Sequence, residues 1–294
     1  MADPAEVLKA RRRLALRAER AFGLTTTRRP SGRSTGLQPV PDDEKPEELP
    51  QPRQQPAQRL EAAGTPELTK DLFGNVVKPK GEEPTSAGPD FDAPPPPRKK
   101  RIELLQALDE TEVKGCTKCE LHENRTHTVF GEGDPMAQLC FIGEGPGENE
   151  DLSGRPFVGR AGELLDKMIA GMGLKREDVY IANVVKCRPP GNRTPTAGEV
   201  ATCTPYLDQQ LEWIRPKVIV TLGLPATRHM LGLNQSMGKM RGQWHAWRGI
   251  KVMPTYHPAY LLRSYTEANR RAVWDDLRLV MEELGLPAPR RRGK

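Results

Sequence analysis

The chain has 294 residues and a formal net charge of +6 at pH 7. This length allows one large domain, or one medium-sized domain with an extended tail. No apolar run approaches the ~20 residues that span a bilayer, and the N-terminus lacks the apolar stretch of a secretory signal, so we expect a cytoplasmic protein without membrane segments. The basic balance favours a polyanionic partner such as nucleic acid, with basic tails on a soluble protein as the alternative.

The first hundred residues have the composition of an arm. Residues 1–101 hold 16 of the 29 prolines and none of the tryptophans or tyrosines, so they bury too little apolar surface to offset the entropy lost on ordering. We expect a basic amphipathic helix over residues 1–23 and a disordered, proline-rich linker over residues 24–100. The helix either contacts a nucleic-acid backbone or a partner, or is simply solvated.

From about residue 101 the pattern changes to strands that alternate with helices. Short apolar runs predict strands over residues 138–142, 179–182, 217–222 and 250–254. Amphipathic or helix-forming stretches predict one helix that begins at residue 102 and four more over residues 161–172, 197–213, 225–231 and 267–284. This alternation predicts an α/β fold of three layers, α/β/α, with a mostly parallel four-stranded central sheet. The domain is expected to cover residues 101–285, with a basic tail over residues 286–294.

Polar or glycine-rich features follow three of the predicted strands. Glu144 lies in a glycine-rich turn, residues 143–147, after the first strand; Asn183 ends the second, and His257 follows the fourth. Because ligands of open parallel sheets bind beyond the carboxyl ends of the strands, we expect these residues to converge in one active site. Taken singly, each has a simpler interpretation: a structural turn, a turn asparagine and a core histidine.

Four cysteines form a candidate metal centre. Cys116 and Cys119 are a tight pair, whereas Cys187 and Cys203 stand apart with 15 residues between them. In a reducing compartment, cysteines are more often metal ligands or free thiols than disulfides. One tight pair with two scattered cysteines fits a four-iron cluster somewhat better than zinc, and both remain open. Cys140 lies inside a predicted strand, where we expect a buried apolar side chain.

Together these segments resemble family 4 of the uracil-DNA glycosylases, the iron–sulfur branch of that superfamily in bacteria and archaea. The resemblance covers about residues 104–285. Two positions depart from the family pattern: Gly145 stands where alanine is frequent, and Ala259 stands where serine is frequent, which removes a hydroxyl contact to a phosphate. The matching blocks are residues 143–151, 154–162, 183–190 and 257–263.

The resemblance implies a base-excision repair enzyme. Such an enzyme excises uracil from DNA by hydrolysing the N-glycosidic bond after base flipping, and it leaves an abasic site. By similarity, the four cysteines of the candidate metal centre would bind one structural [4Fe-4S] cluster that pins the loops facing DNA. The segment between Asn183 and the following helix lacks the histidine by which a related branch traps DNA covalently, which favours turnover.

The resemblance also implies how the base is recognised. Phe157 would stack on the flipped uracil. Asn183 would read the N3 and O4 edge and reject cytosine, where donor and acceptor are exchanged. The backbone of the turn, including Gly143 and Gly145, would hold the base together with Glu144.

For the chemistry, the resemblance assigns a second set of roles. His257 would donate to uracil O2 as negative charge develops there. Glu144 would orient or activate the attacking water and stabilise the positive sugar. The segment that holds Tyr260, Leu261 and Arg263 would enter the DNA groove and help to hold the base out.

The expected partner is uracil-containing DNA, single- or double-stranded, bound by a monomer in the nucleoid. Two alternatives are a non-catalytic nucleic-acid module and a four-cysteine zinc scaffold. Residues 68–73 of the linker loosely resemble peptides that dock bacterial repair proteins on the replicative sliding clamp, although the initial glutamine is missing. An incidental apolar spot is the other interpretation of that segment.

Overall fold

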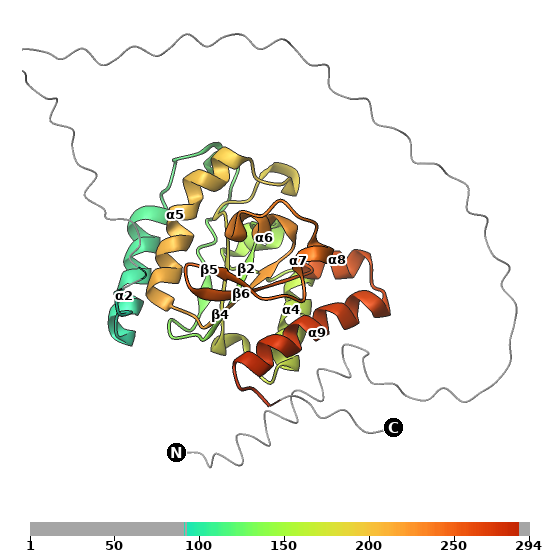
Figure 1. The fold of residues 1–294 in the computed structure, drawn as a ribbon. Helices are drawn as coiled ribbons and strands as arrows, with labels where there is room; N and C mark the ends of the chain where they lie inside the picture. Colours follow the sequence, from blue (N-terminus) through green and yellow to red (C-terminus); the bar gives the residue numbers. More distant parts are fainter. Residues whose placement is uncertain (1–90, 92, 288–294) are drawn as a thin grey trace, which may run out of the picture. The chain divides into compact units, whose positions relative to one another are not determined.

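The computed structural model describes residue 91 and residues 93–287 (Figure 1). The predicted basic helix, the clamp-like segment, most of the linker and most of the basic tail lie outside the described residues. Within the described part, six strands form one sheet in the order β1-β3-β2-β4-β6-β5. They are β1 (Glu132–Gly133), β2 (Leu139–Gly143), β3 (Tyr180–Asn183), β4 (Val218–Leu222), β5 (His245–Trp247) and β6 (Ile250–Thr255).

The centre of the sheet is parallel, as predicted. Strands β3, β2, β4 and β6 are the four predicted strands, and their pairings are all parallel. The structure adds two short antiparallel edges, β1 against β3 and β5 against β6. Edges of two and three residues are too short to show the alternation by which a strand is recognised in sequence.

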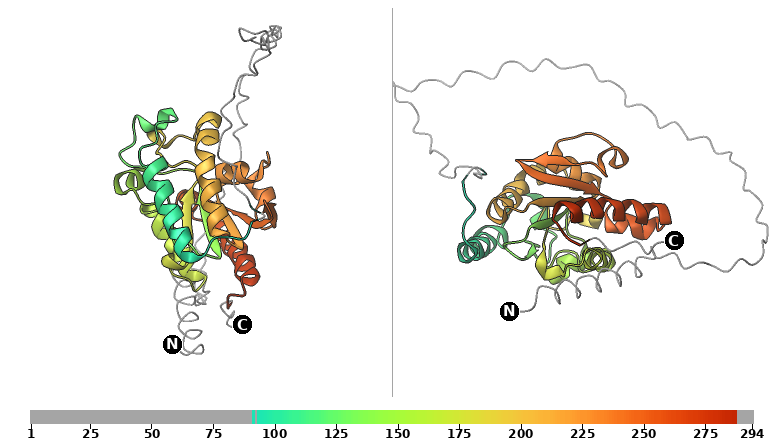
Figure 2. Two further views of the ribbon diagram at one scale, coloured as in Figure 1. Left: turned by 90° about the vertical axis from the view of Figure 1, so that its left-hand side faces the viewer. Right: turned by 60° about the horizontal axis from the view of Figure 1, so that its bottom comes forward.

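Helices cover both faces of the sheet and give the predicted α/β/α layers (Figure 2). Phe141 and Val220 point to a core shared with α4 and α9, whereas Cys140 and Ile219, one residue away, point to a core shared with α2, α5 and α6. None of the helices in the described part combines the length and apolar character that crossing a membrane requires. The α-helices are α2 (Arg98–Leu108), α3 (Glu148–Ser153), α4 (Arg160–Gly171), α5 (Ala197–Ile214), α6 (Leu224–Leu231), α7 (Met237–Met240), α8 (Pro258–Arg263) and α9 (Glu267–Glu283).

A buried arginine anchors the start of the folded domain. Helix α2 begins at Arg98, inside the range predicted as linker. The side chain of Arg101 donates from Nε to the Pro96 carbonyl at 2.6 Å, and from Nη1 to the carbonyls of Ile214 at 2.6 Å and Pro135 at 3.1 Å. One guanidinium thus joins the segment before α2, the end of α5 and the loop before β2.

Replacing Arg101 with leucine should lower the free energy of unfolding by about 3 kcal/mol, because three carbonyls lose a charged donor that is shielded from water. Lys100→Ala is the matched control, since Lys100 is exposed and forms a surface ion pair with Glu103 on the same helix. Chemical denaturation of both variants measures the difference. Equal stability of the two variants would contradict the anchoring role of Arg101.

Candidate active site

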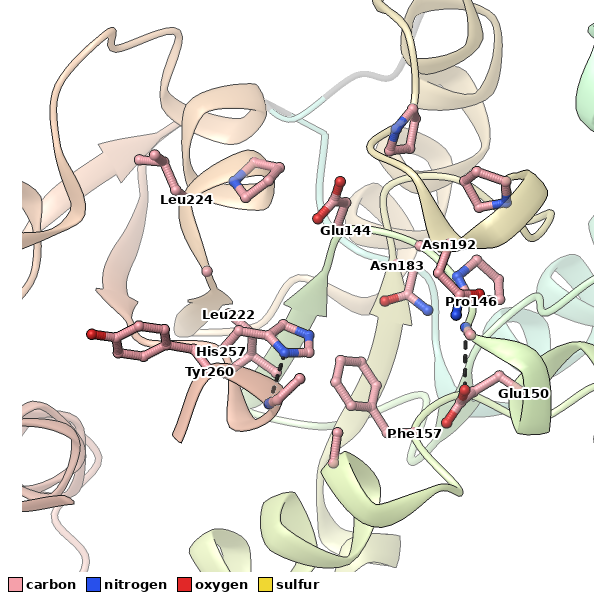
Figure 3. Close-up of a pocket in the computed structure, with 18 of the residues that line it drawn as sticks. Glu144, Pro146, Glu150, Phe157, Asn183, Asn192, Leu222, Leu224, His257 and Tyr260 are labelled. Atoms are coloured by element: carbon pink, nitrogen blue, oxygen red, sulfur yellow. Dashed lines mark hydrogen bonds between the residues drawn. The ribbon is translucent and has the colours of Figure 1, made fainter. Parts of the chain in front are cut away.

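A cavity lies at the carboxyl ends of the parallel strands (Figure 3). Its volume is approximately 680 Å³, within the range of ligand-binding pockets. Its walls come from the loops after β2, β3, β4 and β6, so the predicted convergence of the strand ends is present. Of the residues predicted for the site, the cavity is lined by Glu144, Gly145, Phe157, Asn183, His257, Tyr260 and Arg263.

Asn183 ends β3 with its side chain buried and only 1% exposed. Its Oδ1 atom has no hydrogen-bond partner among the described residues. An unpaired buried acceptor costs about 1–3 kcal/mol, so a donor supplied by a ligand in the cavity would recover that free energy. The side chains of Asn183 and Phe157 both lie close to the backbone of Gly143 in the neighbouring strand. A Cβ at Gly143 would lie 2.3 Å from Asn183 Oδ1 and 2.6 Å from Phe157 Cζ, so this packing requires glycine.

His257 is held as a neutral imidazole with a defined tautomer. It caps α8, and its Nδ1 accepts a hydrogen bond from the Ala259 N–H at 3.0 Å. The ring proton therefore resides on Nε2. Burial, reinforced by Arg263 and opposed by Glu150, lowers the pKa of His257 to about 4. At neutral pH the cavity thus contains an imidazole N–H donor without a formal positive charge.

The lowered pKa of His257 should make the free energy of unfolding depend on pH. As pH falls from 6.5 to about 4, the unfolded chain binds a proton at His257 that the folded chain does not. The free energy of unfolding should therefore fall by up to roughly 3 kcal/mol over that window, with no contribution from His257 above it. His257→Gln should remove this part of the slope. Denaturation curves from pH 4 to 8 test it, and parallel profiles for the two proteins would refute it.

Phe157 forms the wall between Asn183 and His257. Its ring centroid lies 5.6 Å from that of His257, with a tilt of 32°. The residue has a φ of 52°, which is uncommon for a bulky side chain and requires support from its surroundings. Part of the support comes from α4: a Cβ at Gly162 would lie 1.9 Å from the Phe157 carbonyl oxygen, so only glycine permits this packing.

Glu144 follows β2 directly and is half-buried at the cavity wall (Figure 3). Burial raises the pKa of its carboxyl, and a hydrogen bond with Thr194 acts in the opposite direction. A carboxylate that is partly withdrawn from water is a stronger proton acceptor than an exposed one. Its position and chemistry suit it to act on a water molecule or on positive charge in the cavity.

The rim of the cavity is partly aromatic. Tyr260 is 37% exposed, and its ring stacks on that of Tyr256 at 5.0 Å. Leu261 differs from its predicted role: it is fully buried and packs in the core with α4. Because neighbouring residues of a helix point about 100° apart, α8 presents Tyr260 to the cavity and Leu261 to the core. The prediction that Leu261 contacts DNA is therefore corrected.

The cavity also contains residues that sequence reasoning missed. Glu150 and Arg193 line it, as does Asn192, whose φ is 57° and whose Oδ1 accepts a hydrogen bond from Arg188 Nε at 2.8 Å. The Pro-Pro-Gly-Asn sequence that ends at Asn192 is a turn signal after β3. That signal indicates a loop at the strand end, but it does not identify a cavity residue.

The four predicted metal-ligand cysteines share one neighbourhood. Cys187 and Cys203 are buried, and Cys116 and Cys119 pack against the same cluster of apolar side chains. Burial raises the pKa of the Cys187 thiol, and both Cys116 and Cys119 add to the effect. Burial likewise raises the pKa of Cys203 to about 11, with contributions from Cys187 and Cys119. Segments far apart in sequence thus bring four thiols within electrostatic reach of one another.

Hydrogen-bond donors surround these sulfurs. Arg125 Nη1 donates to Cys187 Sγ at 3.1 Å, and the Tyr206 hydroxyl donates to Cys116 Sγ at 3.3 Å. Such donors stabilise thiolates and tune iron–sulfur centres. In the described part of the chain, no set of three or more histidine, cysteine or acidic side chains is arranged around a single metal ion. Cys140 is buried inside β2, as predicted.

Lys186 connects the cysteines to Asn183. Its side chain is only 1% exposed, and its Nζ donates to the Asn183 carbonyl at 2.9 Å and to Gln210 Oε1 at 2.7 Å. Its backbone N–H donates to Cys203 Sγ at 3.2 Å. One residue therefore contacts both the strand end that bears Asn183 and the cysteine neighbourhood.

Comparison with known proteins shows which family the chain matches. Residues 130–278 match the Uracil DNA glycosylase superfamily. The chain is 52% identical over 179 residues to the type-4 uracil-DNA glycosylase of Thermotoga maritima, covering 60% of this chain and 93% of that protein. It is 48% identical over 182 residues to the type-4 uracil-DNA glycosylase of Saccharolobus solfataricus, covering 59% and 83% respectively.

A type-5 uracil-DNA glycosylase of Pyrobaculum aerophilum is more distant, with 34% identity over 169 residues that cover 49% of this chain and 74% of that protein. The type-4 relatives are therefore matched over more of their length and at higher identity. The resemblance seen in the sequence is confirmed. The chain belongs to the uracil-DNA glycosylase superfamily and, within it, to the type-4 family.

Proposed function

We propose that this chain excises uracil from DNA by hydrolysing the N-glycosidic bond of a flipped-out nucleotide, leaving an abasic site for base-excision repair. The observation that carries the proposal is the buried Oδ1 of Asn183, which has no hydrogen-bond partner within the described part of the chain and lies at a cavity lined by Phe157 and His257. The type-4 uracil-DNA glycosylases named above support the choice of substrate. Because the cavity lies inside the protein surface, the base has to leave the stack to reach it.

Asn183 selects uracil by its hydrogen-bonding edge. Uracil presents an N3–H donor, which pairs with the free Oδ1, and an O4 acceptor, which pairs with the amide N–H. Cytosine exchanges donor and acceptor at these positions and leaves buried groups unpaired, a mismatch that costs far more than a lost apolar contact. Phe157 stacks on the base, and the backbone of Gly143 and Gly145 flanks it.

His257 stabilises the leaving group. As the glycosidic bond breaks, negative charge develops on uracil O2, and the Nε2–H of neutral His257 donates to it. This donor is fixed before the reaction by the bond from the Ala259 N–H, so little reorganisation is required. Glu144 orients or activates the water that attacks the sugar, and its negative charge stabilises the developing positive charge there.

The DNA strand contacts the rim of the cavity. Tyr260 is exposed there beside Arg263, and an arginine at this position neutralises a phosphate. Ala259 offers no hydroxyl for that purpose.

The four cysteines Cys116, Cys119, Cys187 and Cys203 hold a [4Fe-4S] cluster in this proposal. The soft donor set, the shared neighbourhood and the donors to sulfur fit such a cluster. When bound, the cluster pins the loops that carry its ligands. Glu144, Asn183 and His257 perform the recognition and chemistry.

Further parts of the proposal rest on sequence alone. The protein acts as a monomer in the cytoplasm, associated with the nucleoid, and its catalytic domain lies between an N-terminal arm and a basic tail. The segment 68–73 of the arm binds the sliding clamp.

Incubation with a uracil-containing oligonucleotide, followed by alkaline cleavage at abasic sites, tests the activity on single and double strands. The control is the same oligonucleotide with thymine in place of uracil. Release of uracil without strand nicking before alkali is the expected result. Binding of both oligonucleotides without release would instead identify a non-catalytic nucleic-acid module. A brown protein that absorbs near ~400 nm would identify the cluster, since zinc is colourless.

A further inference from the structure

Glu150 has an unusual set of hydrogen bonds for a residue that lines the cavity. It lies on the short helix α3, and its carboxylate accepts three backbone N–H groups. Oε2 accepts from Gly147 at 3.1 Å, and Oε1 accepts from Val158 at 2.8 Å and from Gly159 at 3.0 Å. Gly147 ends the glycine-rich turn after β2, whereas Val158 and Gly159 directly follow Phe157. One carboxylate therefore joins the two loops that enclose the base site.

These bonds separate the roles of the two carboxylates in the cavity. A carboxylate has about four lone-pair sites, and Glu150 uses three of them on the backbone. Glu144 has no backbone N–H bonded to its carboxylate in the described part of the chain and hydrogen-bonds Thr194. The Glu144 carboxylate is thus available to water and substrate, whereas the Glu150 carboxylate is occupied by backbone hydrogen bonds that fix the two loops.

Phe157 is the residue that depends most on this support. Its φ of 52° is a conformation that a free loop would leave. The N–H groups of the two residues that follow it point to Glu150, and helix α4 packs against its carbonyl through Gly162. The backbone of Phe157 is therefore held from two sides, and the Glu150 side also contacts the glycine-rich turn.

We propose that Glu150 is a positioning residue: by accepting the N–H groups of Gly147, Val158 and Gly159, its carboxylate sets the ring of Phe157 at the distance from the glycine-rich turn that a flipped base requires. This inference rests on the proposed uracil excision. Glu150 itself touches neither the base nor the water. Its effect appears only when a base occupies the cavity.

Three variants test the role. Glu150→Gln preserves shape and one acceptor oxygen, but it turns an amide donor toward the Gly147 N–H. It should lower kcat/KM for uracil excision roughly tenfold, as expected when one charge-assisted hydrogen bond is lost. Glu150→Ala loses all three bonds and should lower kcat/KM roughly a hundredfold. Glu148→Gln removes the same charge from the exposed side of the same helix and should stay within about twofold of the wild type.

A binding measurement separates positioning from general destabilisation. Affinity for free uracil should fall in Glu150→Gln, because its stacking partner is displaced. Affinity for an oligonucleotide with a reduced abasic site should stay unchanged, because no base enters the cavity. Equal losses for both ligands would mean that the variant is merely unfolded or distorted and would overturn the proposal.

A double-mutant cycle then asks whether Glu150 acts through Phe157. In a Phe157→Ala background, Glu150→Gln should cost less than twofold, because the ring it positions is gone. A full tenfold loss in that background would overturn the proposal. Wild-type excision with an unaffected Glu150→Gln variant would reject this inference alone, whereas absence of excision by the wild type would reject the proposed function.

Discussion

Replacing Asn183 with alanine should reduce kcat/KM for uracil excision roughly a thousandfold. The reduction follows from the loss of both hydrogen bonds to the base edge in a buried site, where polar mismatches are more costly than lost apolar contacts. Single-turnover kinetics with a uracil oligonucleotide measure it. Asn234→Ala is the matched control, because Asn234 is exposed and lies outside the cavity. Comparable rates for the two variants would remove Asn183 from the recognition site.

A second substitution at the same position tests the direction of recognition. Asn183→Asp places two acceptors where an amide offered a donor and an acceptor, and an acidic side chain accepts from the cytosine amino group. The ratio of uracil excision to cytosine excision should therefore fall. An unchanged ratio would mean that another part of the cavity reads the base edge.

Replacing Cys187 with serine should abolish stable iron binding and remove the absorbance near ~400 nm. Because metal binding contributes directly to the free energy of folding, the melting temperature should fall as well. We expect at least a tenfold loss of excision activity, because Cys187 lies four residues after Asn183. Iron analysis, absorbance and thermal denaturation of the purified protein provide the three measurements.

Cys140→Ala provides the matched control for the cysteine prediction. Cys140 is also a buried thiol, but it lies inside β2 and its pKa is raised by burial alone. This variant should retain iron and absorbance at wild-type levels. Loss of iron in Cys140→Ala together with its retention in Cys187→Ser would contradict the assignment of ligands.

The strand-end residues of the cavity could be predicted because topology constrains them strongly. Once four apolar runs are assigned to parallel strands, the residues that follow them have to meet at one edge of the sheet. The strand assignment alone was enough to place Glu144, Asn183 and His257 at this edge. The resemblance to a known family added Phe157, whose position depends on a loop that the alternation of strands and helices does not describe.

Other features depended on details that side-chain patterns do not encode. Glu150 acts on backbone N–H groups, and Asn192 enters the cavity through a left-handed backbone conformation. Leu261 was misassigned because the last matching block was treated as one DNA-facing segment, although an apolar residue beside Tyr260 on a helix is typical of a core position. The two edge strands were missed because they are too short to show a period.

The contacts of Lys186 restrict the length of the chain around it. The backbone from Asn183 to Cys187 has three requirements to meet. It ends β3 in register with β2, and it directs the Lys186 ammonium group back to the Asn183 carbonyl. It also places the Cys187 thiol near the other cysteines. A single inserted residue would shift one of these contacts without restoring the others, because residues 184–187 form a run of bends whose backbone directions place all three groups. This five-residue stretch therefore works as a spacer of fixed length between the strand end and the cysteines.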